Sequence, residues 1–125
     1  MTKQLFKYCN GFLLLDKTYY NNCYWLDDMN GWYFLDSVNL INNGYKIYGT
    51  IDINYDNYNL NQLELYLYKN GFILKPTTNF KYYKQQYLWG GIWDKVHNGW
   101  FFDNIIYYNT LIKLGINDID LNNLE

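Results

Sequence analysis

The stretch that decides the fold reads Leu63-Glu64-Leu65-Tyr66-Leu67-Tyr68-Lys69-Asn70-Gly71-Phe72-Ile73-Leu74-Lys75. Its leucines recur at every second position, which is the period of a β-strand with one buried face. Asn-Gly is a strong signal for a two-residue hairpin turn, because such a turn needs positive φ and glycine adopts positive φ without steric cost. The stretch therefore predicts an antiparallel hairpin whose tip is Asn70-Gly71.

The same Asn-Gly-aromatic signal occurs five times in the 125 residues, and five of the nine glycines follow an asparagine. The five copies are Asn10-Gly11-Phe12, Asn30-Gly31-Trp32, Asn43-Gly44-Tyr45, Asn70-Gly71-Phe72 and Asn98-Gly99-Trp100. An aromatic residue that leaves a turn covers the neighbouring strand of an antiparallel pair. We expect several of these sites, and up to all five, to be hairpin tips.

The remaining segments follow from their periodicity and from turn residues. Residues 3–9 with 12–16, and residues 24–29 with 32–41, are expected to form two further hairpins. Residues 45–53 alternate and predict a strand with Tyr45, Ile47, Ile51 and Ile53 on one face. Residues 103–114 carry a helical stripe, with Asp103 near the N-cap and Gly115 as the C′ residue. The acidic tail, residues 116–125, is expected to be frayed.

These elements predict a mainly β fold of antiparallel hairpins, arranged as a sandwich or a half-closed barrel, with one C-terminal helix. An α+β arrangement is the alternative. Because no linker or low-complexity stretch interrupts residues 1–125, and two domains in this length would each have a small core, we expect a single β-rich domain.

Composition excludes several classes of protein. The chain has 22% aromatic residues, a net charge of −2 and two cysteines, which excludes a disordered chain or a disulfide-rich mini-protein. It has no arginine and no basic block, so a nucleic-acid partner is not expected. The longest early apolar run, residues 12–15, is too short for a signal peptide or a membrane span. We therefore expect a cytoplasmic protein with free thiols at Cys9 and Cys23.

Two segments align without gaps, residues 25–34 and residues 93–102. Both read Trp-x4-Asn-Gly-Trp-aromatic-Phe, and they contain four of the five tryptophans. The favoured interpretation is that two similar hairpins arose because each needs a large cross-strand aromatic pair. Duplication of a half-domain is the alternative, although the intervening sequence does not repeat.

Residues 25–45 also resemble one repeat of the choline-binding family of bacterial cell-wall proteins. The resemblance rests on Trp25-x6-Trp32-Tyr33-Phe34 followed by Gly44-Tyr45, and it ends after Tyr45. In that family, aromatic side chains of successive hairpins form cages for choline through cation–π contacts. The resemblance implies a ligand cage that uses the tryptophans of these hairpins.

Residues that could support catalysis or metal binding are few. His97, the sole histidine, could be a general base oriented by Asp94, with Cys9 or Cys23 as nucleophile, but no catalytic motif surrounds them. Residues 52–63 resemble a calcium loop, but Asn57 and Leu63 occupy the positions that require Gly and Glu. We expect no enzymatic activity, no cofactor and no metal.

A chain with so many aromatic residues has more of them than a small core can hold. Alternation places Tyr48, Tyr66 and Tyr68 opposite the expected core face, and Tyr and Trp are favoured at binding interfaces. The alternative is that a second sheet or the C-terminal helix covers this face. We therefore expect a non-catalytic protein-binding protein with an unidentified protein target. A small inhibitor, immunity or anti-defence protein from a phage or other mobile element of an AT-rich genome fits this description.

Two alternatives remain open. A carbohydrate- or choline-type ligand binder would use Trp25, Trp32, Trp93 and Trp100. A structural subunit would form a homo-oligomer, because an exposed edge strand rich in Tyr and Leu can pair with a copy of itself.

Overall fold

A computed structural model describes residues 4–16, 22–36, 41–42 and 44–119. The chain divides into two compact units, Met1–Ile53 and Asn54–Glu125, and each unit is described here by itself. Each unit contains its own sheet and its own buried side chains. The expected single domain over residues 1–125 stays a prediction.

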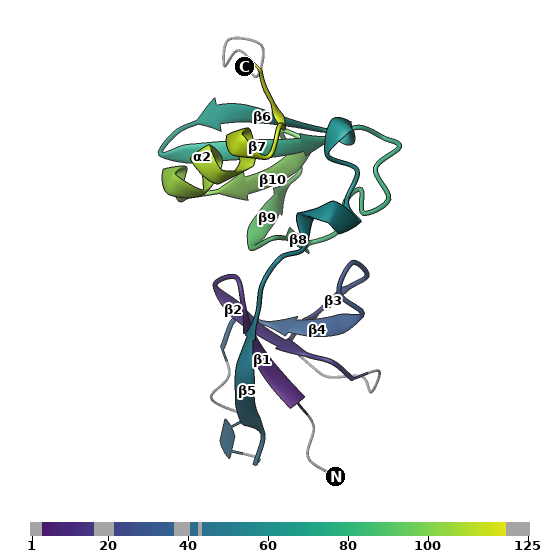
Figure 1. Cartoon of the computed structure of the whole chain (residues 1–125), viewed down its shortest axis with the longest axis vertical. Coiled ribbons are helices and arrows are strands. Elements are labelled where there is room, and N and C mark those ends of the chain that lie inside the picture. Colours follow the sequence, from purple (N-terminus) through teal and green to yellow (C-terminus); the bar gives the residue numbers. More distant parts are fainter. Residues whose placement is uncertain (1–3, 17–21, 37–40, 43, 120–125) are drawn as a thin grey trace. The chain divides into compact units, whose positions relative to one another are not determined.

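The first unit is a five-stranded sheet in the order β3-β4-β2-β1-β5. Its strands are β1 (Gln4–Tyr8), β2 (Gly11–Leu14), β3 (Tyr24–Leu26), β4 (Gly31–Phe34) and β5 (Lys46–Ile51). The first four strands form two antiparallel hairpins that are joined between β2 and β4. The fifth strand runs parallel to β1 and occupies one edge of the sheet (Figure 1).

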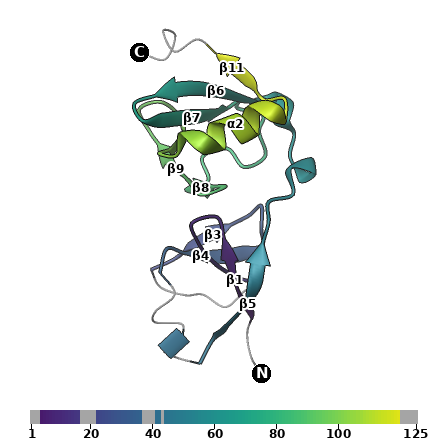
Figure 2. The same ribbon diagram turned by 60° about the vertical axis from the view of Figure 1, so that its left-hand side comes forward.

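The second unit is a six-stranded sheet in the order β11-β6-β7-β10-β9-β8. Its strands are β6 (Leu63–Tyr68), β7 (Gly71–Pro76), β8 (Tyr87–Leu88), β9 (Gly91–Asp94), β10 (Gly99–Phe102) and β11 (Asn117–Ile119). Two single-turn 3-10 helices, Tyr55–Asn57 and Leu60–Gln62, precede β6. The helix α2 (Ile105–Lys113) packs on one face of this sheet (Figure 2).

The predicted fold class is confirmed: the protein is mainly β, built on hairpins, with one C-terminal helix. Two details are corrected. Both sheets are mixed, because β5 pairs in parallel with β1 and β11 pairs in parallel with β6. Part of the tail that was expected to be frayed is the strand β11, and residues 120–125 lie outside the described residues.

Four of the five Asn-Gly sites lie at hairpin turns, as predicted. The predicted reason, positive φ at the glycine, is wrong. Gly11, Gly31, Gly71 and Gly99 do not adopt positive φ; each is the first residue of a strand. In the two-residue turns the positive φ falls on Cys9 and Lys69, two residues before the glycine, and in the longer turns it falls on Asn30 and Asn98, directly before the glycine.

A neighbouring strand lies close to all four glycines, and at Gly11, Gly71 and Gly99 it leaves no room for a Cβ. A Cβ at Gly99 would lie 2.7 Å from the carbonyl oxygen of Leu74, and one at Gly11 would lie 2.5 Å from that of Phe34. Real Cβ atoms essentially never come nearer than 3.0 Å to such an atom. The recurring glycine is thus explained by close packing between hairpins as well as by the turn itself.

The fifth site, Asn43-Gly44, is not a hairpin tip. Ile41 and Asn42 are helical, and the Gly44 N–H donates to the carbonyl oxygen of Ile41 over 3.0 Å. With φ of 92°, Gly44 is positioned as a helix C′ residue. It directs the chain through Tyr45 into β5, and Asn43 itself lies outside the described residues.

The second unit ends its helix in the same way. Asn104, rather than Asp103, is the N-cap of α2, and its side chain accepts from the Ile106 N–H over 3.0 Å. Gly115 has φ of 95°, and its N–H donates to the carbonyl oxygen of Ile112 over 3.0 Å. The expected C′ role of Gly115 is confirmed.

Apart from β8, which has no counterpart in the first sheet, the strand orders of the two units match, and duplication stays one of the two explanations for the repeated hairpins. In both, two hairpins join through the second strand of each, and a helical turn ending at a positive-φ glycine leads into a strand parallel to the first. The registers coincide: Leu5 pairs with Leu14 as Leu65 pairs with Leu74, and Trp25 pairs with Trp32 as Trp93 pairs with Trp100. The two tryptophan pairs also have matching geometry, with ring centroids 5.2 and 5.1 Å apart.

Candidate functional site at the open edge of strand β5

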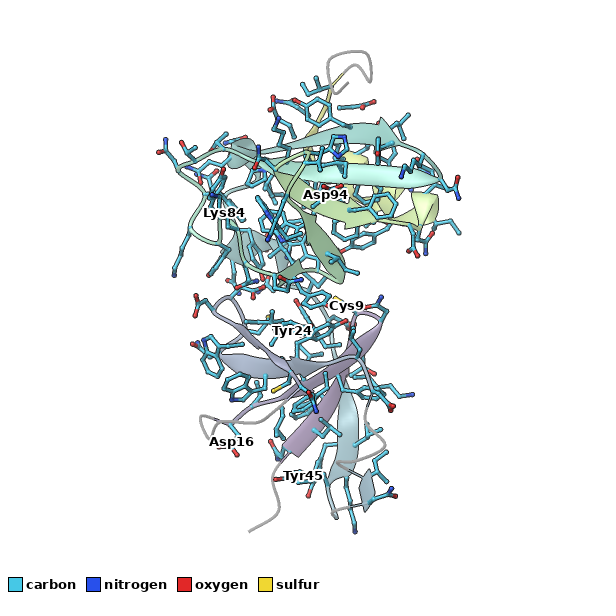
Figure 3. The ribbon with its side chains drawn as sticks, turned by 180° about the vertical axis from the view of Figure 1, so that it is seen from behind. Cys9, Asp16, Tyr24, Tyr45, Lys84 and Asp94 are labelled. Atoms are coloured by element: carbon cyan, nitrogen blue, oxygen red, sulfur yellow. The ribbon has the colours of Figure 1, made fainter. Side chains whose placement is uncertain are left out.

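The outer edge of β5 is the most accessible strand surface in the described part of the chain. The strand begins after Gly44, and Tyr45 packs against the buried cluster of Leu5, Leu14 and Phe34. Figure 3 labels Tyr45 beside the start of the strand. Pairing with β1 fixes one side of β5, and no described strand pairs with the other side. Its backbone N–H and C=O groups on that side therefore face away from the sheet.

Both faces of β5 are open as well. Lys46, Ile47, Tyr48, Gly49 and Thr50 are all exposed, and only Ile51 is partly buried. Ile47 is 37% exposed and Tyr48 is 51% exposed. By comparison, β7 has five buried residues among its six. An isoleucine and a tyrosine on an open strand give a partner both apolar contact area and backbone hydrogen-bonding groups.

A β-bulge lies in the middle of this strand. Leu5 pairs with Ile47 and the next residue, Phe6, pairs with Gly49, so Tyr48 is the extra residue. The bulge also makes the prediction that Ile47 and Ile51 share one face wrong. Ile51 pairs with Tyr8, so it lies on the opposite face of the strand from Ile47. Bulges bend an edge strand and thereby restrict which strands can pair with it.

Opposite charges lie at the two ends of the strand. Lys46 is its first residue, and the exposed Asp52 follows its last residue. Each one flanks the apolar middle at an equal distance along the sequence from Gly49. Of the residues in this stretch, only Tyr48 is predicted from the sequence to be a binding residue. Alternation had assigned Ile47 to the buried face, and an edge strand cannot be distinguished from a central one by period alone.

The predicted tyrosine surface is not assembled within one sheet. Tyr48 lies on β5 in the first unit, whereas Tyr66 and Tyr68 lie on β6 in the second. Tyr66 is on the face opposite Leu65 as expected, and it is only 8% exposed, so of the two alternatives for this face the covered one holds at Tyr66. Burial raises the pKa of Tyr66, as does the nearby Glu64 carboxylate. The Lys75 Nζ lies 5.8 Å from the Tyr66 ring centroid.

Tyr68 is half-buried among other rings. Its centroid lies 4.5 Å from that of His97 and 6.1 Å from that of Phe101. The Lys69 Nζ lies 5.1 Å from the same ring. Tyr68 therefore stabilises the sheet face around it, and little of its ring is free for a partner.

The four tryptophans of the predicted ligand site are buried to different degrees and pack within the protein. Trp100 is fully buried and donates from Nε1 to the carbonyl oxygen of Gln85 over 2.6 Å. Trp93 packs edge-on against Trp100 and also contacts Tyr83. Trp25 and Trp32 are partly buried, and Trp25 donates to Asp27 over 2.7 Å. Since the hairpins are paired within sheets, these rings contact each other and not an open cage.

His97 and Asp94 do meet, as the sequence suggested. His97 Nδ1 lies 3.1 Å from Asp94 Oδ2. Burial raises the pKa of Asp94, but hydrogen bonds from the His97 side chain and from the Val96 and His97 backbone N–H groups outweigh this and lower it overall. Figure 3 labels Asp94 on the second sheet. The carboxylate accepts two backbone hydrogen bonds in the β9–β10 turn, so its local role is to hold that turn.

The two cysteines are free thiols in an environment that disfavours the thiolate. Desolvation by burial raises the pKa of Cys9 to about 12; a hydrogen bond with Tyr8 lowers it, and the Asp28 charge raises it further. Burial also raises the pKa of Cys23. Since the thiolate is the nucleophilic form, both are poor nucleophiles at neutral pH.

The described ranges contain neither a cluster of metal-binding side chains nor a helix that could cross a membrane. In residues 4–16, 22–36, 41–42 and 44–119, no three His, Cys, Asp or Glu side chains are placed to hold a metal ion. No helix in those ranges has the length and apolar character needed to cross a membrane. Comparison with models of known protein families, with curated proteins and with solved structures found no match.

Proposed function

We propose that this chain is a non-catalytic protein-binding protein whose docking surface is the outer edge of β5. The observation that carries the proposal is the combination of an unpaired strand edge with exposed Ile47 and Tyr48 on it. A partner that adds an extended strand gains backbone hydrogen bonds along the edge and side-chain contacts on both faces. The poor thiol nucleophiles and the turn-holding role of Asp94 support a binding role over a catalytic one.

The proposal is narrower than the surface expected from the sequence. Of the predicted binding residues, Tyr48 is the one exposed by half or more, whereas Tyr66 and Trp100 are buried. The ligand-binder alternative requires open tryptophan faces, and no observation favours it. The cytoplasmic location and the origin in a mobile element stay predictions.

A site-specific crosslinking experiment tests the proposal. A photo-reactive phenylalanine replaces Tyr48 in the full chain, and a second version carries it at Val96, which is 83% exposed on the second unit. We expect partner adducts from position 48 in cells that express the chain, and none from position 96. The adduct is identified by mass spectrometry, and its affinity is then measured with purified components.

Exchange of Ile47 and Tyr48 for serine is the matched loss-of-function variant. We expect at least a tenfold loss of affinity, the size of an interface hot spot, because both side chains are exposed anchors. Thermal stability should change little, since neither side chain is part of the core. Equal affinity of the Ile47→Ser/Tyr48→Ser variant for the adduct partner would overturn the proposal, as would adducts from position 96 alone.

A further inference from the structure

The two-residue turns that follow β1 and β6 have matching backbones. In each turn, the last residue of the strand pairs with the glycine of an Asn-Gly dipeptide. The two dipeptides are Asn10-Gly11 and Asn70-Gly71. The first turn residue has a φ of 54° in one turn and 53° in the other, and both asparagines are exposed. A difference in the chemistry of the two dipeptides therefore comes from the side chains around them.

In the first unit, the Tyr33 phenol covers the Asn10-Gly11 dipeptide. Its hydroxyl donates to Asn10 Oδ1 over 2.5 Å. A Cβ built on Gly11 would lie 2.7 Å from both Cζ and the hydroxyl oxygen of Tyr33. Tyr33 is fully buried, so its ring is held in place by the close-packed core. The Asn10 carboxamide is thus fixed in one orientation.

The second unit has Phe101 where the first unit has Tyr33. Each pairs with the third residue of the second strand in its unit. Each ring also packs edge-on against the tyrosine that ends the first strand, with centroids 6.1 Å apart in both units. Phe101 has no hydroxyl, and the three atoms nearest to a Cβ at Gly71 are all backbone atoms. Over the described residues, the Asn70 carboxamide has no hydrogen-bond partner.

An Asn-Gly dipeptide can react with itself. The glycine nitrogen attacks the side-chain Cγ of the asparagine and forms a C–N bond, while the side-chain amide leaves as ammonia with the proton that the glycine nitrogen gives up. Water then opens the resulting five-membered imide at either carbonyl, which leaves aspartate or isoaspartate. Glycine promotes the attack because it has no Cβ to hinder the approach. A hydrogen bond that fixes the carboxamide opposes it, because the side chain must rotate over the next peptide.

We propose that Asn70 is a site of spontaneous deamidation in the folded protein, with water as the second reactant, and that the Tyr33 hydroxyl protects Asn10 from the same reaction. This inference does not depend on the docking role of β5. Deamidation adds a negative charge beside Lys69, whose Nζ lies 5.1 Å from the Tyr68 ring centroid. Isoaspartate also adds a carbon to the backbone of a two-residue turn, so it changes the geometry of the β6–β7 hairpin.

Peptide mapping by mass spectrometry measures both rates in one sample of the full chain, kept at mildly alkaline pH and physiological temperature. We expect Asn70 to deamidate about fivefold faster than Asn10, the ratio that corresponds to one hydrogen bond of about 1 kcal/mol. In denaturant the two rates should be similar, because Gly-Phe follows both asparagines. Equal rates in the folded chain would overturn the proposal.

Exchange of the two aromatic residues tests the cause of the difference. Tyr33→Phe removes the hydroxyl that holds Asn10, and we expect the Asn10 rate to rise about fivefold, towards that of Asn70. Phe101→Tyr supplies a hydroxyl at the equivalent position and should slow the reaction at Asn70. An Asn10 rate that stays at the wild-type value in Tyr33→Phe would overturn the protection. An unchanged Asn70 rate in Phe101→Tyr would overturn the equivalence on which the proposal rests.

Asn30-Gly31 is the internal control for a general loosening of the first unit. It lies in the same sheet as Tyr33 but in a longer turn, between β3 and β4. We expect its rate to be the same in wild type and in Tyr33→Phe, while the Asn10 rate rises. If Asn10 and Asn30 accelerated together, the cause would be partial unfolding, and the specific protection by Tyr33 would be wrong.

Discussion

At the scale of single residues, glycine accounts for most of what is distinctive about this sequence. Four of the five Asn-Gly glycines lie where the next hairpin comes within a van der Waals contact of the backbone. Asparagine or the residue before it supplies the left-handed turn, and glycine supplies the missing side chain. The Asn-Gly dipeptide therefore recurs because two separate requirements, a left-handed turn residue and a residue without a side chain, fall at neighbouring positions.

Gly71→Ala tests this interpretation. A Cβ there would lie well inside 3.0 Å of the Phe102 carbonyl oxygen, which belongs to a paired strand and cannot rotate away. We expect the free energy of unfolding to fall by about 2–3 kcal/mol, the usual cost of overpacking. The measurement is chemical denaturation followed by tryptophan fluorescence.

Gly49→Ala is the matched control for that experiment. Gly49 is also a strand glycine without positive φ, but nothing lies within 4 Å of an added Cβ. We expect stability to stay the same or to rise by about 0.5 kcal/mol, because alanine restricts the unfolded chain. Equal costs at both positions would contradict the close-packing explanation.

At the scale of elements, Asp94 connects the β9–β10 turn to pH. Its lowered pKa means that the folded state holds the carboxylate in its charged form. A group whose pKa is lower in the folded state stabilises the protein above its unfolded value, here 3.8, and this stabilisation is lost as the pH falls below it. The turn should therefore weaken in acid.

Asp94→Asn tests the role of this carboxylate. At pH 7 we expect a loss of about 1.5–3 kcal/mol, the usual size for hydrogen bonds to a charged group. Between pH 5 and pH 3 the difference from wild type should shrink, because wild type loses the same interactions. Denaturation curves at several pH values measure it, with the exposed Asp103→Asn as control. A difference that does not change with pH would contradict the assignment.

At the scale of the whole molecule, one topology occurs twice. Leu13 and Ile73 are different residues, but they occupy the same position in the strand register of their units. Both of these side chains are fully buried. We therefore expect each unit to tolerate the side chain found at the equivalent position of the other unit better than it tolerates truncation to alanine.

Exchange of these two side chains tests the equivalence. We expect Leu13→Ile and Ile73→Leu to cost less than about 1.5 kcal/mol each, and Leu13→Ala and Ile73→Ala to cost about 2–5 kcal/mol each. Thermal or chemical denaturation of the four variants gives the comparison. If the exchanges cost as much as the truncations, the two cores are packed differently and the equivalence is limited to the backbone.

Residue pattern alone was enough to predict the hairpins, the C-terminal helix and its terminating glycine, and the contact between His97 and Asp94. These features depend on residues near each other along the chain, through turn conformation, capping and period. The folded structure was needed to find that Gly44 ends a helical turn, that β5 and β11 pair in parallel, and that Tyr66 is buried while Ile47 is exposed. Those outcomes depend on which distant strand is the neighbour, and a strand of period two carries the same pattern at a centre or at an edge.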